Sequence, residues 1–547
     1  MPARKMRTAA ALAGGLVGAT MLATSSGAAG TLLDLTHVPA PNPKAAGVSS
    51  PNALSPELAE IEAARGSIPL ENGTALISHY GYNGDGPMLP TPGDVQAVGH
   101  NVEASKSEPD KNVYLVLEHQ RGADPLYDYG THFLFQGHEI GKQGYVTRIN
   151  LDADTAHRVT LIATNDENGP LPTYDGITWD PFRHKLLLAS EHGNSPTGGV
   201  WAISAELPAS GLAVGHQLPG FGFGGYEGIQ NDAQGNVLVV EDIGGTTVPT
   251  KARQPNSFVY KFVPRERGSL EAGALYALQV TSARSGQPIT FHAADAVGDT
   301  FSPDVADLHT YGKSFGTMWV LVHDTASDGA ASFDANLAAK AAGATPFKRP
   351  ENGVFRPGTG FREYYFTETG DTNTTSTAND GFGGWGAVFR LVLDEPGSMT
   401  GTLSPFALGD QAHTGFDNIA FASKNALAVV EDASDGVHTS RNALDSGYLY
   451  DASRNYADGT APLRFLAEGR DPSATIDSAL SGSPGFQNDG DNEITGIHFS
   501  DGDASVGGIL GAKVPHTFRA GWRAFYTAQH GDNITWELIK PGLKRRS

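Results

Sequence analysis

The sequence predicts an all-β protein, a β-propeller of six or seven blades with a carboxylate metal site in its central channel. Short apolar strands that end in an acid or a histidine recur along the chain, at Glu118, Glu191, Glu241, Asp324, Glu368, Glu431 and His530. The 68 glycines and 33 prolines among 547 residues suit many short strands joined by turns. A ring of repeated sheets reaches this length as one unit with a continuous core.

Each repeat pairs two acids at a near-constant spacing, one opening a strand and one closing the next. The pairs are Asp175 and Glu191, Glu227 and Glu241, Asp307 and Asp324, Glu351 and Glu368, and Asp417 and Glu431, and Glu493 opens a last repeat. A strand, a tight turn and a second strand bring both acids to one end of an antiparallel hairpin. Hairpins repeated around a ring therefore gather their acids on one face, around the central channel.

Carboxylates gathered in this way indicate a binding site for a hard cation. In a partly dry site, adjacent carboxylates cannot all remain ionised unless cations offset their repulsion, and oxygen ligands suit Ca²⁺ or Mg²⁺. The predicted lining of the channel mouth is Glu191, Glu227, Glu241, Asp242, Glu351, Glu368, Asp417, Glu431 and Glu493. The alternative, which the residues leave open, is that these acids accept hydrogen bonds from turn amides and hold the blades together.

Arg349 stands directly before Pro350 and Glu351. A guanidinium beside a ring of carboxylates can bind an anionic substrate that the ring alone would repel, and proline stiffens the segment. The simpler alternative is an ion pair between Arg349 and Glu351. We take Arg349 and Glu351 as the candidate catalytic residues.

The ends of the chain differ in composition from its centre. Residues 1–30 have a basic start, an apolar run and a small-residue stretch, which predict a secretory signal peptide, with a membrane anchor as the alternative. Residues 31–66 are expected to form a linker with one short helix near Pro56 to Arg65. Residues 67–540 are expected to form a single propeller domain and residues 541–547 a basic tail.

Charge and cysteine content exclude several classes of partner and site. The formal net charge of −22 repels nucleic acid and anionic lipid, so neither nucleic acid nor a membrane is an expected partner. The absence of cysteine from the sequence excludes disulfides and thiolate metal ligands. We expect a secreted or extracytoplasmic monomer.

Several of these stretches resemble the PhoX-type alkaline phosphatase family of exported, metal-dependent propeller proteins. In the family's order they are QGHE at Glu139, YEGI at Glu227, RPEN at Glu351, FDNIAF at Asp417, EITG at Glu493 and QHGD at His530. The resemblance implies a cluster of calcium and iron ions and a phosphate-ester substrate. It implies Glu227, Glu351 and Asp417 as metal ligands, with Arg349 on the phosphoryl group. Glu191 and Glu493 complete the ligand set that we predict.

One departure from the family's pattern concerns iron. The family's phosphatases use a cysteine as an iron ligand in a T-C-E-E type strand end, where this chain offers Ser190 beside Glu191. Ca²⁺ is therefore the expected cofactor, and Ser190 places Fe³⁺ in question. The expected function is an exported metal-dependent phosphomonoesterase. A calcium-dependent lactonase-like hydrolase and a non-catalytic secreted propeller stabilised by calcium are the alternatives.

Overall fold

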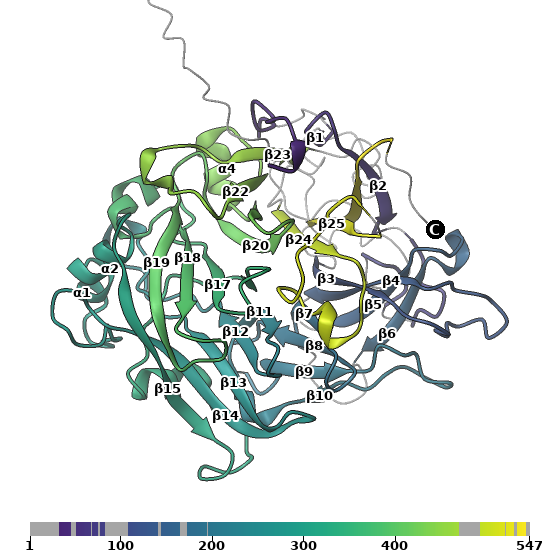
Figure 1. Cartoon of the computed structure of the whole chain (residues 1–547), viewed down its shortest axis with the longest axis horizontal. Helices are drawn as coiled ribbons and strands as arrows, with labels where there is room; N and C mark the ends of the chain where they lie inside the picture. The colour runs from purple at the N-terminus through teal and green to yellow at the C-terminus, as the bar shows by residue number, and fades with distance from the viewer. Residues whose placement is uncertain are drawn as a thin grey trace, which may run out of the picture.

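The computed structural model describes residues 32–44, 51–66, 68–74, 77–81, 108–139, 144–164, 172–193, 195–469, 493–519, 521–529 and 533–542. Over these residues the chain folds into six four-stranded blades arranged as a propeller, so the blade number is six (Figure 1). The predicted signal peptide, His530 and residues 543–547 of the predicted tail lie outside the described residues.

The first three blades are antiparallel meanders that each start with their innermost strand. Blade 1 consists of β3 (Glu108–Val116), β4 (His132–Glu139), β5 (Tyr145–Asn150) and β6 (Val159–Thr164). Blade 2 consists of β7 (Tyr174–Asp180), β8 (Lys185–Ser190), β9 (Gly199–Ile203) and β10 (His216–Gln217). Blade 3 consists of β11 (Tyr226–Asn231), β12 (Val237–Glu241), β13 (Val259–Glu266) and β14 (Ser269–Val280).

The last three blades repeat this order. Blade 4 consists of β16 (Gly353–Phe355), β17 (Glu363–Glu368), β18 (Ala387–Leu393) and β19 (Thr400–Leu408). Blade 5 consists of β20 (Phe416–Phe421), β21 (Ala426–Glu431), β22 (Ser446–Asp451) and β23 (Leu463–Ala467), with β1 (Ala53–Leu54) added at its edge. Blade 6 consists of β24 (Glu493–Ser500), β25 (Arg523–Gln529), β26 (Ile534–Ile539) and β2 (Ala59–Ala64).

One further strand joins two blades. β15 (Phe315–Asp324) pairs with β14 on one side and with β19 on the other, so blades 3 and 4 share a nine-stranded sheet. Short helices accompany the connections: α1 (Ala296–Thr300) and α2 (Pro303–Leu308) precede β15, α3 (Ala335–Ala341) follows it, and α4 (Asp435–Arg441) follows β21. Within the described part of the chain, no helix has the length and apolar character needed to cross a membrane.

The prediction of a linker with a helix over residues 31–66 is wrong. β2 pairs with β26, with Ile61 opposite Glu537, and completes blade 6 with a strand from near the start of the chain. Alanine and glutamate favour a helix when only the local sequence is considered. The edge of β26, which comes from the other end of the chain, offers backbone hydrogen-bond partners that favour a strand instead. The N-terminal segment therefore closes the ring.

The hydrophobic core lies between neighbouring blades. Side chains alternate along a strand, so consecutive residues pack against different neighbours. Val239 packs with residues of blade 2, including Leu187, whereas Val240 packs with Phe366 and Phe389 of blade 4. Equivalent clusters lie at the other contacts between blades, including the contact of blade 6 with blade 1. The second strand of a blade is consequently buried on both faces, which explains the unbroken apolar runs in the sequence.

Candidate metal centre

The innermost strands deliver acids to the channel through β-bulges. β3, β7, β11, β20 and β24 each have a register shift near the end at which the strand begins. In four of these strands an acid lies inside the shift, namely Asp110, Asp175, Glu227 and Asp417. A bulge breaks the regular alternation and redirects a side chain, so it turns these carboxylates toward the channel.

Glycines after two of these acids allow the innermost strands to approach one another. A Cβ atom on Gly176 would lie 1.9 Å from the Glu227 carbonyl oxygen, and one on Gly228 would lie 2.7 Å from the Asn352 Cα. The Gly228 N–H donates to the Glu351 carbonyl oxygen at 2.7 Å, which ties blade 3 to blade 4. The motifs YDG and YEG therefore combine a channel-facing acid with the glycine that its crowded position requires.

Three of the acids that end second strands, Glu241, Glu368 and Glu431, belong to none of the groups of converging carboxylates among the described residues, contrary to the prediction. Glu241 accepts hydrogen bonds from Asn336 Nδ2 (2.9 Å) and Tyr260 Oη (3.2 Å). Glu431 accepts from the Thr414 and Ser446 amides, and Glu368 accepts from the Lys348 amide and contacts His309. These acids hold hairpins and loops together, as the structural alternative proposed.

Strand alternation explains this difference, because the residue after each such acid points the opposite way. That next residue is Asp242 in blade 3, and Glu191 takes the same place after Ser190 in blade 2. Ser190 therefore occupies the position in blade 2 that Glu241 occupies in blade 3. Its buried hydroxyl has no hydrogen-bond partner among the described residues.

Three further acids lie outside the repeat to which they were assigned. Glu118 follows the C-terminal end of β3, which is an innermost strand, so it lies at the end of the strand opposite to Asp110. Asp324 ends β15, the strand that joins blades 3 and 4, and Asp307 lies in α2. None of these three acids belongs to a group of three converging acidic or histidine side chains among the described residues.

The remaining acids form one connected cluster. Four groups of three carboxylates each bring one oxygen per residue within 4.8 Å of the others, and the groups share members. The groups are Asp110, Glu139 and Glu493; Glu139, Asp175 and Glu191; Glu191, Glu227 and Asp242; and Glu227, Glu351 and Asp417. We call these nine residues the carboxylate cluster. It contains all five predicted ligands, Glu191, Glu227, Glu351, Asp417 and Glu493, which come from five different blades.

Burial and mutual repulsion disfavour the charged form of these acids. Burial, reinforced by Glu139, raises the pKa of Asp110 to about 8. Burial and Asp242 raise the pKa of Glu351 to about 7, although Arg349 opposes them. Burial together with neighbouring carboxylates raises the pKa of Glu227 and of Asp417 well above the usual range. The cluster therefore calls for cations.

Arg349 supplies a fixed positive charge at the edge of this cluster. Its Nε lies 2.9 Å from both carboxylate oxygens of Asp242, and its Nη2 lies 2.6 Å from Asp242 Oδ2 and 3.3 Å from Glu351 Oε1. Burial opposes the charged guanidinium, but Asp242 and Glu351 together outweigh it and raise the pKa of Arg349. The side chain remains 20% exposed, so it is reachable from solvent.

Two residues in this region, Asp110 and Lys111, were not predicted from the sequence. Asp110 and Lys111 are adjacent in β3 and buried, and Lys111 Nζ donates to Asn352 Oδ1 at 2.6 Å. Asn352 Nδ2 in turn lies 3.3 Å from Glu227 Oε1 and 3.4 Å from Asp417 Oδ1. The signal for Asp110 was the acid before the apolar run NVYLVL, which reads as an innermost strand. No sequence signal distinguishes a buried lysine here from a solvated one.

Comparison with known proteins agrees with this architecture. A family model described as alkaline phosphatase PhoX matches residues 228–509, and among curated proteins no sequence matches. The solved structure of Pseudomonas fluorescens PhoX in complex with vanadate, a transition state analogue, aligns with a TM-score of 0.52 at 11% identity, covering 92% of this chain and 98% of that chain. The WD40 domain of Toxoplasma gondii coronin aligns with a TM-score of 0.33 at 11% identity, covering 83% and 90%. Because the family model matches more than half of this chain, the chain belongs to the PhoX alkaline phosphatase family.

Proposed function

We propose that this protein is an exported phosphomonoesterase that hydrolyses small phosphate esters with the help of calcium ions held by the carboxylate cluster. The observation that carries the proposal is the contact of Arg349 with Asp242 and Glu351. Both acids belong to the groups whose oxygens converge within 4.8 Å. A fixed cation thus adjoins a cluster of carboxylates that could hold metal ions, and this arrangement supports recognition of a phosphate dianion.

The donors of the cluster fit hard cations. All nine side chains offer carboxylate oxygens, and the chain has no cysteine. Asp175 Oδ1 is buried and has no hydrogen-bond partner among the described residues, which suits a metal ligand. We propose Glu191, Glu227, Glu351, Asp417 and Glu493 as calcium ligands, with Asp110, Glu139, Asp175 and Asp242 completing the set. The same oxygens would accept Fe³⁺, and elemental analysis distinguishes the two ions.

Ions bound in the cluster would neutralise its charge and polarise the phosphoryl group. Hydrolysis joins a water oxygen to phosphorus and breaks the ester P–O bond, and the proton that the water loses ends on the leaving alcohol. Arg349 would stabilise the charge on the non-bridging phosphoryl oxygens. Its Nε and Nη2 are engaged by Asp242, whereas its Nη1 makes one contact of 3.3 Å, with Thr372 Oγ1. The Nη1 edge is therefore the edge that is available to substrate.

The test is hydrolysis of p-nitrophenyl phosphate by the purified protein, before chelation, after chelation and after return of calcium. We expect turnover that is lost on chelation, restored by calcium and inhibited by vanadate, the ligand of the P. fluorescens structure. Glu351→Gln should lose this activity, whereas Glu271→Gln, which alters an acid that is 60% exposed, should keep it. Full calcium occupancy without phosphatase turnover would overturn the proposal, and hydrolysis of lactones in its place would indicate the lactonase-like alternative.

Export is the second part of the proposal, and residues 1–30 support it by their composition. Its test is the N-terminal sequence of protein recovered from the culture medium of an expressing bacterium. We expect a mature chain that begins near residue 31. Protein that stays inside the cell with residues 1–30 intact would contradict export and would leave the catalytic proposal standing.

A further inference from the structure

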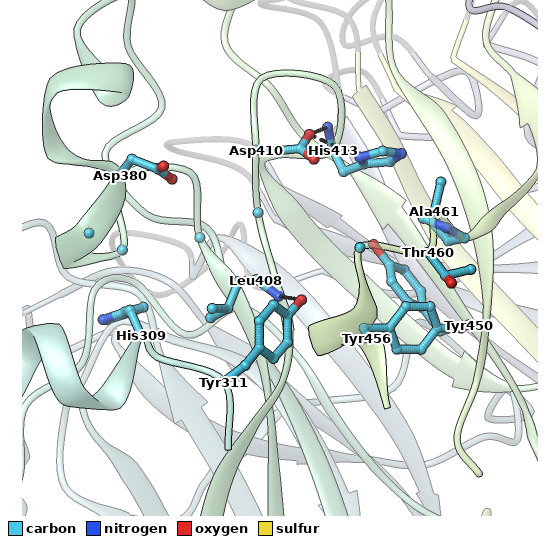
Figure 2. A pocket seen from close by; sticks show the side chains of 16 residues that line it. His309, Tyr311, Asp380, Leu408, Asp410, His413, Tyr450, Tyr456, Thr460 and Ala461 are labelled. Atoms are coloured by element: carbon cyan, nitrogen blue, oxygen red, sulfur yellow. Dashed lines mark hydrogen bonds and ion pairs between the residues drawn. The ribbon is translucent and has the colours of Figure 1, made fainter. Parts of the chain in front are cut away.

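A pocket of about 360 Å³ lies beside blades 4 and 5, and none of the nine carboxylates of the cluster lines it. Figure 2 shows its walls: Asp380 and His309 on one side, Tyr311 and Leu408 below, and Tyr450, Tyr456 and Thr460 on the other side. The loop with Asp410 and His413 closes the top of this view. The volume is within the range of small-molecule sites in proteins.

Tyrosine rings form one wall of the pocket. The rings of Tyr450 and Tyr456 meet edge to face, with centroids 5.1 Å apart. The Tyr311 hydroxyl accepts from the Leu408 amide at 2.8 Å, and the Tyr456 hydroxyl accepts from the Asp451 amide at 2.6 Å. Tyr450 is only 2% exposed and lines the pocket, yet its hydroxyl makes no hydrogen bond to any described residue. A hydroxyl at a pocket wall that has no protein partner is available to a ligand that supplies one.

Two carboxylates face this wall. Asp410 Oδ1 is held by its own loop, through the Ala412 amide (2.7 Å) and the His413 amide and Nδ1 (both 2.9 Å). The Asp380 carboxylate has no hydrogen bond or ion pair with the described residues, and burial and the Asp410 carboxylate raise its pKa. Neither lysine nor arginine is among the described residues that line the pocket. The basic side chains of the lining are His309, which contacts Glu368, and His413, which contacts Asp410, so Asp380 is the carboxylate of the lining that is left for a cationic ligand.

The chemistry of the lining selects the kind of ligand. An anion would meet two carboxylates, so anions are disfavoured. Among the described residues, neither Asp380 nor Asp410 belongs to a group of three metal-ligating side chains within 4.8 Å, which argues against a bare metal ion. Aromatic faces together with carboxylates are what an ammonium group binds, through cation–π attraction and charge. An unpaired tyrosine hydroxyl adds a place for a hydroxyl on the same ligand.

We propose that this pocket is a second ligand site, which binds a small organic cation, an amine or quaternary ammonium compound that also carries a hydroxyl group. The ammonium lies between Asp380 and Asp410 against the tyrosine rings, and the ligand hydroxyl bonds to Tyr450 Oη. The site is separate from the carboxylate cluster, and it stands whether or not the protein is a phosphatase.

The test is calorimetric titration of the full-length protein, loaded with calcium, with choline and with its neutral isostere 3,3-dimethylbutan-1-ol. We expect choline to bind and the neutral alcohol to bind at least about ten-fold more weakly. Asp380→Asn should weaken choline binding about ten-fold or more, and Tyr450→Phe should weaken it several-fold. Glu206→Gln makes the same charge change at an exposed residue outside the pocket and should leave the affinity unchanged.

Melting temperatures control for folding, since Asp380 is exposed and its substitution should leave the melting temperature as in the unchanged protein. Equal binding of choline and of the neutral alcohol would overturn the proposal, because it would remove the role of charge. Choline affinity that is the same in Asp380→Asn, in Tyr450→Phe and in the unchanged protein would also overturn it, as would the absence of any choline binding.

Discussion

Arg349 Nη2 lies 3.3 Å from Glu351 Oε1, although a single residue separates the two in the chain. The backbone makes this contact available, because Arg349 has a φ of 59°, a left-handed conformation that is costly for a residue with a side chain. The Thr369 amide donates to the Arg349 carbonyl at 2.9 Å and fixes the turn. The chain thus maintains a strained turn that holds a cation and a carboxylate at the edge of the same cluster.

Arg349→Ala should lower kcat/KM for p-nitrophenyl phosphate by about 10²–10³-fold, the usual cost of removing one donor to transition-state charge. Arg349→Lys should recover part of this loss, since lysine keeps the charge but not the planar fork that engages Asp242. Calcium content should stay unchanged in both variants. Arg265→Ala alters an arginine that pairs with Asp324 at the end of β15 and is the matched control. Unchanged kcat/KM in Arg349→Ala would contradict the assigned role.

Lys111→Met should destabilise the calcium-free protein by about 3 kcal/mol, because it removes a buried cation from beside Asp110, Asp175, Asp417 and Glu227. Bound calcium supplies replacement charge, so the loss in melting temperature should be larger with chelator than with calcium.

Lys261→Met is the matched control for Lys111→Met. Its ammonium is also buried, but it donates to the Gly397 carbonyl at 2.7 Å, away from the cluster. Its loss should destabilise the protein to the same extent with and without calcium. Equal behaviour of the two lysine variants would show that Lys111 does not act as a counter-ion to the cluster.

His498 predicts a pH dependence of stability. Burial, with a contribution from Lys111, lowers its pKa from 6.5 to about 3, and its Nε2 accepts from the Tyr114 amide at 3.2 Å. A histidine that is neutral in the folded state and protonates in the unfolded state contributes stability above pH 6.5, and this stability is lost as the pH falls toward 3. Between pH 7 and pH 5 the loss is about 2 kcal/mol.

His498→Gln keeps an acceptor for the Tyr114 amide but does not titrate. Urea unfolding at pH 7 and pH 5 should show that the fall in unfolding free energy is smaller in this variant, by about 2 kcal/mol. An identical fall in both proteins would mean that His498 is not held neutral.

Ring closure by β2 gives a prediction that separates a structural strand from a linker. A chain that begins at residue 67 should lose the cooperative unfolding transition of a chain that begins at residue 32, because blade 6 loses its outer strand and Ala64 leaves the core shared with Tyr114 and Phe525. Circular dichroism during urea unfolding measures this. Equal midpoints would restore the interpretation of residues 31–66 as a linker.

The propeller was predictable from the sequence because the pattern that indicates it lies within short stretches of the chain. Each blade repeats a hairpin whose apolar runs and turn residues are readable without knowledge of the partners. The closure of blade 6 was not readable, because it depends on β2 meeting β26 from the other end of the chain. The blade number was not predictable because NVYLVL is an innermost strand, whereas the acid that follows it, Glu118, made it resemble a second strand.

The site was predictable in part for the same reason. Glu191, Glu227, Glu351, Asp417 and Glu493 follow from position in the repeat, and the structure brings them together. The prediction that Glu241 and Glu431 line the channel was wrong. Neighbouring residues in a strand point to opposite faces of the sheet, so an error of one residue reverses the predicted direction of a side chain. Lys111 was not predictable, since its burial depends on three other blades that surround it.

The central claim is that acids from separate blades share ions that none could hold alone. The most direct measurement is the anomalous difference density of crystals grown with calcium and recorded at a wavelength where calcium scatters anomalously. We predict peaks within about 2.3–2.6 Å of carboxylate oxygens of Glu227, Glu351 and Asp417. A well-ordered structure in which these three carboxylates carry no anomalous peak, with calcium only on surface acids, would contradict the claim.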